Sequence, residues 1–195
     1  VFFNEDTGEI SITKVPSTPK EPFQAVLNGV KELVDQGAAA RDISFFCHGT
    51  TVGTNTLLEE KGAKTGLVVT RGTRDVYIIG RGNRPEAYNL FFHRHQPLVS
   101  RRHTCEVDER LLASGEVHEP LKKSSVAAAC KALKAEGVEA VAVCFLHAYA
   151  NPEHERIAGA MIKKAIPDVY LSLSHDILRE YREFERMSTT VVNAY

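Results

Sequence analysis

The segment with the most chemical potential is an eight-residue run of hydroxyl, imidazole and amide side chains, His48-Gly49-Thr50-Thr51-Val52-Gly53-Thr54-Asn55. Apolar residues precede it and the helix-forming Leu57-Leu58-Glu59 follows it, so it is expected at a strand-to-helix junction. The N-terminus of a helix leaves four backbone N–H groups unpaired and carries a partial positive charge. The run therefore predicts a site for phosphate or for a polar substrate.

Two roles are expected within this run. Gly49 lets the backbone approach a ligand closely, and the threonine hydroxyls add hydrogen-bond donors. An ordinary threonine cap beside a buried His48 explains the same residues without any ligand. The run is neither a Walker loop nor a GxGxxG turn, because no Gly-Lys-Ser/Thr follows and the glycine spacing differs.

An arginine cluster is the second candidate site, formed by Arg71, Arg74, Arg81 and Arg84. The guanidinium fork binds carboxylates and phosphates through two parallel hydrogen bonds, so the cluster could clamp an anion. Ion pairs at the surface, with Asp75 and Glu86 as partners, are the alternative. Arg81 and Arg84 are the stronger candidates for anion binding because they lie among Gly, Asn and Pro.

Histidines offer a weaker signal. His93 and His95 have the i, i+2 spacing that could place two metal ligands on one strand face. No carboxylate or cysteine stands nearby at a suitable spacing, so no metal site is predicted. His147 follows an apolar strand, at the sheet edge where α/β proteins bind ligands, although a role in capping the next loop explains it as well.

Ser174-His175-Asp176 is not expected to act as a serine hydrolase triad, because alternate residues of a strand face opposite ways. The charged residues that follow it are read as a helix face. Glu180, Glu183 and Arg186 are spaced for ion pairs along that face.

The elements that must hold these residues alternate between strand and helix patterns, with hairpins at residues 1–15 and at 106–121, the second turning at Ser114-Gly115. Strands are expected at residues 43–48, 65–70, 140–146 and 169–173. Helices are expected at 26–34, at 57–61, from a Ser124 cap to Gly137, from Pro152 towards Lys164, and from about Arg179. Residues 71–103 lack periodicity. The fold class is therefore α/β, a mixed sheet with βαβ units.

Composition limits the classes of partner. The chain of 195 residues has 24 Lys+Arg against 25 Asp+Glu, a balance that gives no electrostatic footprint for nucleic acid or an anionic membrane. No apolar run approaches the roughly 20 residues of a membrane span. The four cysteines show no CxxC spacing, which favours free thiols in a reducing cytoplasm.

Taken together, the motifs resemble the hydantoinase A/5-oxoprolinase family. The run from His48 to Glu59 resembles the family's HGTT-x-x-TN-x-LLE signature. Further blocks follow in the family's order over nearly the whole chain: Thr70-Arg71-Gly72 with Arg74-Asp75, Ile79-Gly80-Arg81 with Arg84-Pro85, Val107-Asp108-Glu109-Arg110, Val143 to His147 with Asn151-Pro152, Ser172-Leu173-Ser174-His175, and Glu183-Phe184-Glu185-Arg186.

The resemblance implies the N-terminal lobe of an actin/hexokinase-like ATPase. Members open cyclic amides (hydantoins, N-methylhydantoins, 5-oxoproline) with ATP hydrolysis, or carboxylate ketones such as acetone and acetophenone. A non-catalytic scaffolding lobe of such a complex is a third possibility. The resemblance gives catalytic roles to His48, Thr50, Thr51 and Asn55, and substrate or phosphate binding to Gly49, Thr54, Arg81 and Arg84.

The resemblance also implies that ATP and Mg²⁺ are held largely by regions outside this chain. It implies a hydantoinase B-type subunit or domain as partner and a homo-oligomer. Residues 1–195 are then expected to be a partial N-terminal domain that is inactive alone, with 179–195 starting the helix that links to the next domain. No Met opens the chain and no stop signal closes it, which agrees with that expectation.

Overall fold

The computed structural model describes residues 1–37, 39–83, 86, 88–93 and 95–195. The chain forms two compact units, Val1–Thr51 and Val52–Tyr195. Each unit has its own elements, and every residue of the apolar core lies in the second.

Unit 1 contains a short antiparallel pair and a helix. The strands β1 (Phe2–Phe3) and β2 (Ile10–Ser11) pair as expected for a hairpin, and α1 runs over Pro22–Asp35. A proline in the first turn suits the start of α1, since its missing N–H would be unpaired there. Gly37 follows with φ of 114°, a backbone conformation that glycine adopts readily. A short 3-10 helix, Ala40–Asp42, completes the unit.

The core of unit 2 is a four-stranded parallel sheet in the order β4-β3-β7-β8. Its strands are β3 (Thr65–Thr70), β4 (Thr104–Val107), β7 (Ala140–Cys144) and β8 (Tyr170–Leu173). The antiparallel pairing of this unit lies in a separate two-stranded sheet, β5 (Arg110–Leu111) with β6 (Val117–Glu119). Parallel neighbours need crossover connections, and helices supply them here.

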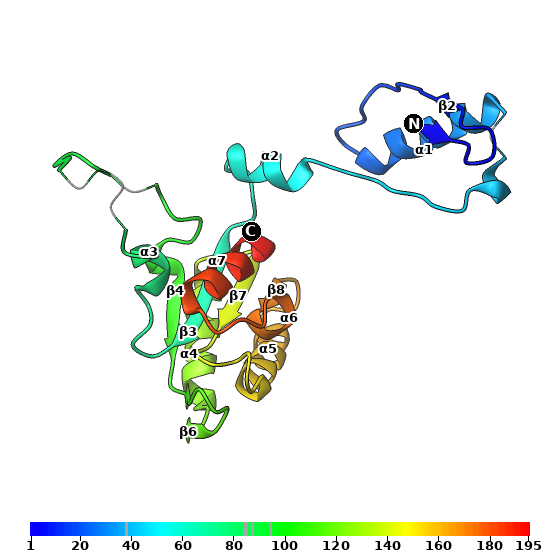
Figure 1. The fold of residues 1–195 in the computed structure, drawn as a ribbon. Coiled ribbons are helices and arrows are strands. Elements are labelled where there is room, and N and C mark those ends of the chain that lie inside the picture. The colour runs from blue at the N-terminus through cyan, green and yellow to red at the C-terminus, as the bar shows by residue number, and fades with distance from the viewer. Residues whose placement is uncertain (38, 84–85, 87, 94) are drawn as a thin grey trace. The chain divides into compact units, whose positions relative to one another are not determined.

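Helices cover both faces of the sheet (Figure 1). Val68, Val141 and Val143 face α4 (Lys123–Ala135) and α5 (Glu153–Ala165). The alternate residues, among them Leu67, Val69, Ala140 and Ala142, face α7 (Glu183–Ala194). Successive strand residues point to opposite faces, so a strand between two helical layers is apolar at most of its positions. The α/β class with βαβ units is confirmed.

Three short helices complete unit 2: α2 (Val52–Leu58), α3 (Val76–Ile79) and α6 (Ser174–Ile177). A 3-10 turn, Arg101–His103, leads into β4. No helix among the described residues is long and apolar enough to span a membrane.

The strand expected at residues 43–48 is wrong. These residues follow the 3-10 helix without regular secondary structure, and Phe45 is 81% exposed. An extended apolar segment becomes a strand only when a neighbour pairs its backbone groups, and no described strand pairs with residues 43–48.

Several boundaries also differ from expectation. The helix expected at residues 57–61 spans Val52–Leu58 instead. Glu106 and Val107 belong to β4, so the second hairpin spans only residues 110–119, although its turn is at Ser114-Gly115 as expected. The N-cap of α4 is Lys122 rather than Ser124. The last helix begins at Glu183 instead of near Arg179, because the short helix α6 comes first.

Candidate functional site

The hydroxyl-rich run lies across the boundary between the units. Its first four residues, His48, Gly49, Thr50 and Thr51, end unit 1 without regular secondary structure. Thr54 and Asn55 lie in α2, the first helix of unit 2. The helix after the junction is thus present, whereas the strand before it is not.

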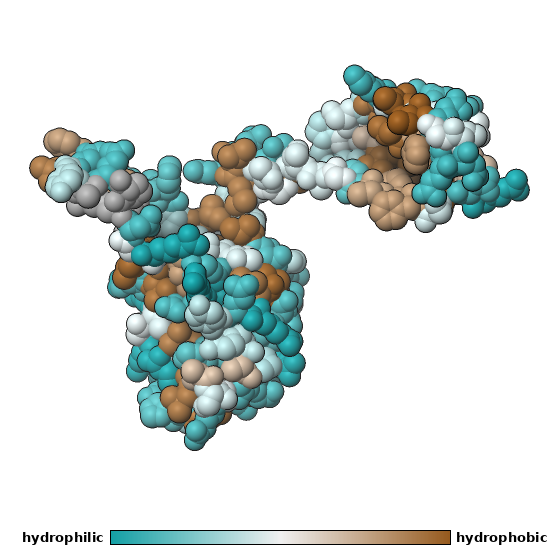
Figure 2. Space-filling view, viewed as in Figure 1, coloured by the Kyte–Doolittle hydropathy of each residue, from teal (hydrophilic) through white to brown (hydrophobic). Residues whose placement is uncertain are grey.

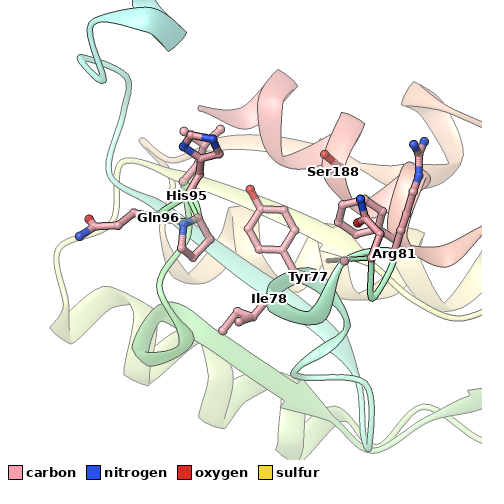
Figure 3. A pocket seen from close by; sticks show the side chains of 11 residues that line it. Tyr77, Ile78, Arg81, His95, Gln96 and Ser188 are labelled. Atoms are coloured by element: carbon pink, nitrogen blue, oxygen red, sulfur yellow. The ribbon is translucent and has the colours of Figure 1, made fainter. Parts of the chain in front are cut away.

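A pocket of about 630 Å³ lies in unit 2, where α3, residues 95–98 and α7 meet. Figure 3 shows Tyr77 in the middle of this pocket, with His95 and Gln96 to one side and Arg81 and Ser188 to the other. The floor is largely apolar, formed by Tyr77, Ile78, Pro97, Leu98 and Phe184. An apolar floor with a few polar groups at the rim is typical of small-molecule sites. We take this pocket as the candidate site.

Arg81 lines the pocket, as a ligand-binding residue should, but it already has a partner. Its Nε donates to Glu185 Oε1 at 2.8 Å, a bond that joins the loop after α3 to α7. The hydrogen bond from Arg81 is the main reason that the pKa of Glu185 lies below its usual value. Glu185 neutralises the charge of Arg81. Arg81 can therefore bind an anion only in competition with Glu185.

Tyr77 brings a hydroxyl to the pocket. Burial raises the pKa of this phenol, and a hydrogen bond with the Leu98 backbone partly opposes the rise. The hydroxyl therefore stays protonated at neutral pH and is available as a neutral hydrogen-bonding group.

The other arginines of the cluster are used elsewhere. Arg71 forms an ion pair with Asp108, and Arg74 donates to the Arg101 carbonyl at 2.9 Å. Arg101 forms an ion pair with Asp75, with its Nε 2.6 Å from Asp75 Oδ1. Arg84 lies outside the described residues. Of the three that the structure describes, Arg81 lines the pocket.

His95 also lines the pocket. Among the described residues, however, no group of three or more His, Cys, Asp or Glu side chains is arranged to hold a metal ion.

A buried polar network at the carboxyl edge of the sheet was not foreseen from the sequence. Glu155, fully buried on α5, accepts hydrogen bonds from the Phe145 N–H at 2.9 Å and from Ser174 Oγ at 2.6 Å. It also receives the His175 N–H at 2.9 Å and contacts His175 Nδ1 at 2.7 Å. One carboxylate thus ties the end of β7 to the start of α6.

The adjacent His154 extends this network to the other strands. Its Nδ1 lies 2.7 Å from Glu109 Oε2, and Glu109 also accepts a hydrogen bond from Thr70 Oγ1. Thr70 Oγ1 in turn accepts the Leu146 N–H at 2.9 Å. Because burial penalises the charged form, the pKa of Glu109 is raised, while His154 and Thr70 oppose that rise.

The network also explains why Ser174-His175-Asp176 is not a catalytic triad. The hydroxyl of Ser174 is fully buried and donates to Glu155 rather than to an imidazole. The residues lie on a short helix, not on the strand that the sequence analysis assumed. These three residues are therefore not a serine hydrolase triad, but the reason is the hydrogen bond from Ser174 to Glu155 and not the alternation of strand residues.

One signal in the sequence could have revealed the network. Pro152 starts a helix a few residues after a buried strand, so the first turn of that helix must lie beside the carboxyl edge of the sheet. His154 and Glu155 occupy that first turn, where acidic residues are ordinarily assigned to the helix dipole.

The chain matches known proteins over its whole length. The model of the hydantoinase/oxoprolinase N-terminal region matches residues 1–166. The chain belongs to this family. An uncharacterised protein of Methanocaldococcus jannaschii, MJ0964, is 38% identical over 100% of this chain and 29% of its own length. The caprolactamase subunit alpha of Pseudomonas jessenii is 34% identical over 96% of this chain and 28% of its own length.

Solved structures agree with this hydantoinase/oxoprolinase assignment. The crystal structure of the ATP-dependent caprolactamase from Pseudomonas jessenii has a TM-score of 0.82 and 33% identity, covering 99% of this chain and 29% of that chain. The nucleotide-free acetone carboxylase has a TM-score of 0.83 and 26% identity, covering 93% of this chain and 28% of that one. The chain therefore spans less than a third of the length of these relatives.

Proposed function

We propose that this chain is the N-terminal part of an ATP-dependent enzyme that opens cyclic amides. The match to the ATP-dependent caprolactamase, over 99% of this chain with a TM-score of 0.82, carries the proposal. The candidate pocket supports it, because a largely apolar floor with Tyr77 and Arg81 at its polar positions suits a small amide ring.

An amide resists hydrolysis because resonance makes its carbonyl carbon a weak electrophile and its nitrogen is a poor leaving group. Transfer of the γ-phosphoryl group of ATP to the amide oxygen, with release of ADP, would activate that carbon for attack by water, and the oxygen could later leave as phosphate. The residues of this chain would then serve by positioning and by stabilising negative charge. The pairing of Arg81 with Glu185 favours a neutral ring over an anionic one at the pocket.

We assign phosphate contacts to the hydroxyl-rich run. The donors there are threonine hydroxyls, an imidazole, an amide and backbone N–H groups, a set that suits phosphate oxygens. His48, Thr50, Thr51 and Asn55 are the proposed catalytic residues, and Gly49 and Thr54 of the same run are proposed to bind substrate or phosphate. Arg84, three residues after Arg81 in the sequence, is proposed as a second anion ligand. The run has no carboxylate, so we assign Mg²⁺ to ligands outside it.

The experiment measures ATP hydrolysis by the complete protein, with its partner subunit, in the presence of a panel of lactams and hydantoins. Thr50→Val is expected to lower turnover about tenfold or more, since one donor to a phosphoryl oxygen is lost. Thr56→Val is the matched control, because the Thr56 hydroxyl bonds the Val52 carbonyl within α2. Wild-type turnover in both Thr50→Val and Arg81→Gln would contradict the assignment of phosphate or substrate contacts to these residues.

A ketone carboxylase subunit is the second candidate, favoured by the TM-score of 0.83 with acetone carboxylase. It predicts that ATP hydrolysis depends on bicarbonate and a ketone rather than on a cyclic amide. Turnover with neither substrate class would favour a scaffolding role. The proposed partner is a hydantoinase B-type subunit, and the proposed location is the cytoplasm.

A further inference from the structure

The corner of unit 2 where β7 ends is held by side chains from three other elements. The Phe145 N–H donates to Glu155 of α5, the Leu146 N–H donates to Thr70 of β3, and the Phe145 carbonyl accepts Arg186 Nη2 of α7 at 2.7 Å. Three consecutive backbone groups are thereby fixed by buried polar residues. Burying carboxylates and an arginine is costly, so the arrangement points to a task beyond stability.

His147 directly follows the two residues, Phe145 and Leu146, whose backbone groups are held in this way. It is half-buried and has φ of 58°, a left-handed conformation that residues other than glycine adopt rarely. Such backbone strain clusters at binding sites. Its Nδ1 lies 3.3 Å from the Tyr149 hydroxyl, with the two rings edge to face at 5.8 Å. Nδ1 is thus engaged, and Nε2 is the nitrogen left for a ligand.

Arg186 places a buried positive charge behind this histidine. Its side chain is 1% exposed, its guanidinium carbon lies 5.4 Å from the centre of the Tyr149 ring, and Nη2 bonds the Phe145 carbonyl. Its Nε and Nη1 have no hydrogen-bond partner within the described part of the chain. The ion pair with acidic residues on its own helix that the sequence suggested is not among its contacts.

Two arginines and one glutamate act on the charge of His147. Burial is the main cause of its lowered pKa, and the guanidinium groups of Arg186 and Arg110 lower it further. Glu183 alone acts in the opposite direction. Arg110 is half-buried and directly follows Glu109, whose carboxylate is already bound to His154 and Thr70.

We propose that His147 and Arg110, with the buried guanidinium of Arg186 behind them, form a binding site for an anionic oxygen group at the carboxyl end of β7. The ligand class is a phosphate or a carboxylate. An anion there would interact with these positively charged groups, and it would lie at the edge where parallel sheets bind their ligands. This site is separate from the pocket around Tyr77 and requires no nucleotide.

Histidine proton NMR on the full chain tests the proposal, with inorganic phosphate and acetate as probes. His147→Asn identifies the signal, because asparagine tolerates the left-handed backbone. An anion at a few millimolar is expected to raise the pKa of His147. Arg110→Gln should weaken that response about fivefold to tenfold. Arg186→Lys should also weaken it, because lysine keeps the charge but loses the fork.

Controls separate a site from general screening by salt. The exposed His118 should not respond to either probe, and Arg156→Gln, an exposed change on α5, should leave the His147 response unchanged. A response to phosphate but not acetate assigns a phosphate, and the reverse assigns a carboxylate. If His147 responds to neither at about 50 mM, or if Arg110→Gln responds like the wild type, the proposal is overturned.

Discussion

Single residues at the carboxyl edge hold together elements that are distant in the sequence. Glu155 accepts hydrogen bonds from the end of β7 and the start of α6, and its neighbour His154 reaches Glu109 and through it Thr70. A buried carboxylate is tolerated only when its oxygens are fully hydrogen-bonded. This edge is therefore sensitive to the loss of one acceptor.

Glu155→Gln is expected to lower the free energy of unfolding by about 2–4 kcal/mol. The amide nitrogen of glutamine cannot accept the His175 N–H, so at least one buried donor loses its partner. Urea unfolding followed by circular dichroism measures the loss. Glu153→Gln is the matched control, because Glu153 is exposed in the same turn, and it should cost no more than about 1 kcal/mol. Equal losses in both variants would contradict the role of the network.

The lowered pKa of His147 has a consequence for stability at acidic pH. In the unfolded chain this histidine takes up a proton near pH 6.5, its ordinary value, whereas in the folded chain it does so at lower pH because of burial. The unfolded state therefore binds more protons as pH falls, and the contribution of His147 to stability, present above about pH 6.5, is lost. His147→Asn should show a shallower loss of stability between pH 7 and 5. A parallel loss in both proteins would contradict the shift.

At the residue scale, the burial of Arg186 could not be predicted from the sequence, for a physical reason. Arg186 was expected in surface ion pairs because its spacing from Glu183 suits them. The structure buries it instead, since α7 packs on the sheet and turns that residue towards Phe145. Charge and spacing along a helix do not reveal which face is buried when the rest of the layer is unknown.

At the scale of elements, strands buried on both faces were the best predicted. β7 is a continuous apolar run, and β3 is apolar between its terminal threonines, because α4 lies on one face and α7 on the other. Residues 43–48 have the same apolar character, but no described strand pairs with them, so the pattern alone predicted a strand that does not form. The hydroxyl-rich run was correctly predicted to lead into a helix, but its second half lies within α2, and its ligand contacts stay a prediction.

Gly66 shows how closely α4 packs on β3. A Cβ at this position would lie 2.7 Å from Leu133 Cδ2. Gly66→Ala is therefore expected to destabilise unit 2 by about 1–3 kcal/mol through overpacking, as measured by thermal unfolding. In a Leu133→Ala background the same change should be neutral or stabilising, because its cause has been removed.

Gly53→Ala is the control for that comparison. It lies in α2, where an added Cβ meets nothing within 4 Å, so it should be neutral or stabilising by up to about 1 kcal/mol. Equal effects of Gly66→Ala with and without the Leu133 side chain would contradict the packing argument.

At the scale of the whole molecule, burial is divided unevenly between the units. The buried hydrophobic residues run from Leu67 to Ala194, all in unit 2, while no described residue of unit 1 is buried. Apolar side chains gather on the surface of unit 1 instead (Figure 2), with Phe23 60% and Phe46 59% exposed. A helix gains most of its stability from packing an apolar face, so α1 is expected to be weakly held.

Hydrogen exchange measures this difference directly. Amides of β3 and β7 should exchange through global unfolding, many orders of magnitude more slowly than those of α1, because local opening costs little where few apolar contacts are made. The fragment 52–195 should retain the protection of β3 and β7, since their core residues all lie within it. Protection of α1 equal to that of β7 in the full chain would contradict the division. So would loss of β7 protection in the fragment, because it would show that the core of unit 2 depends on residues 1–51.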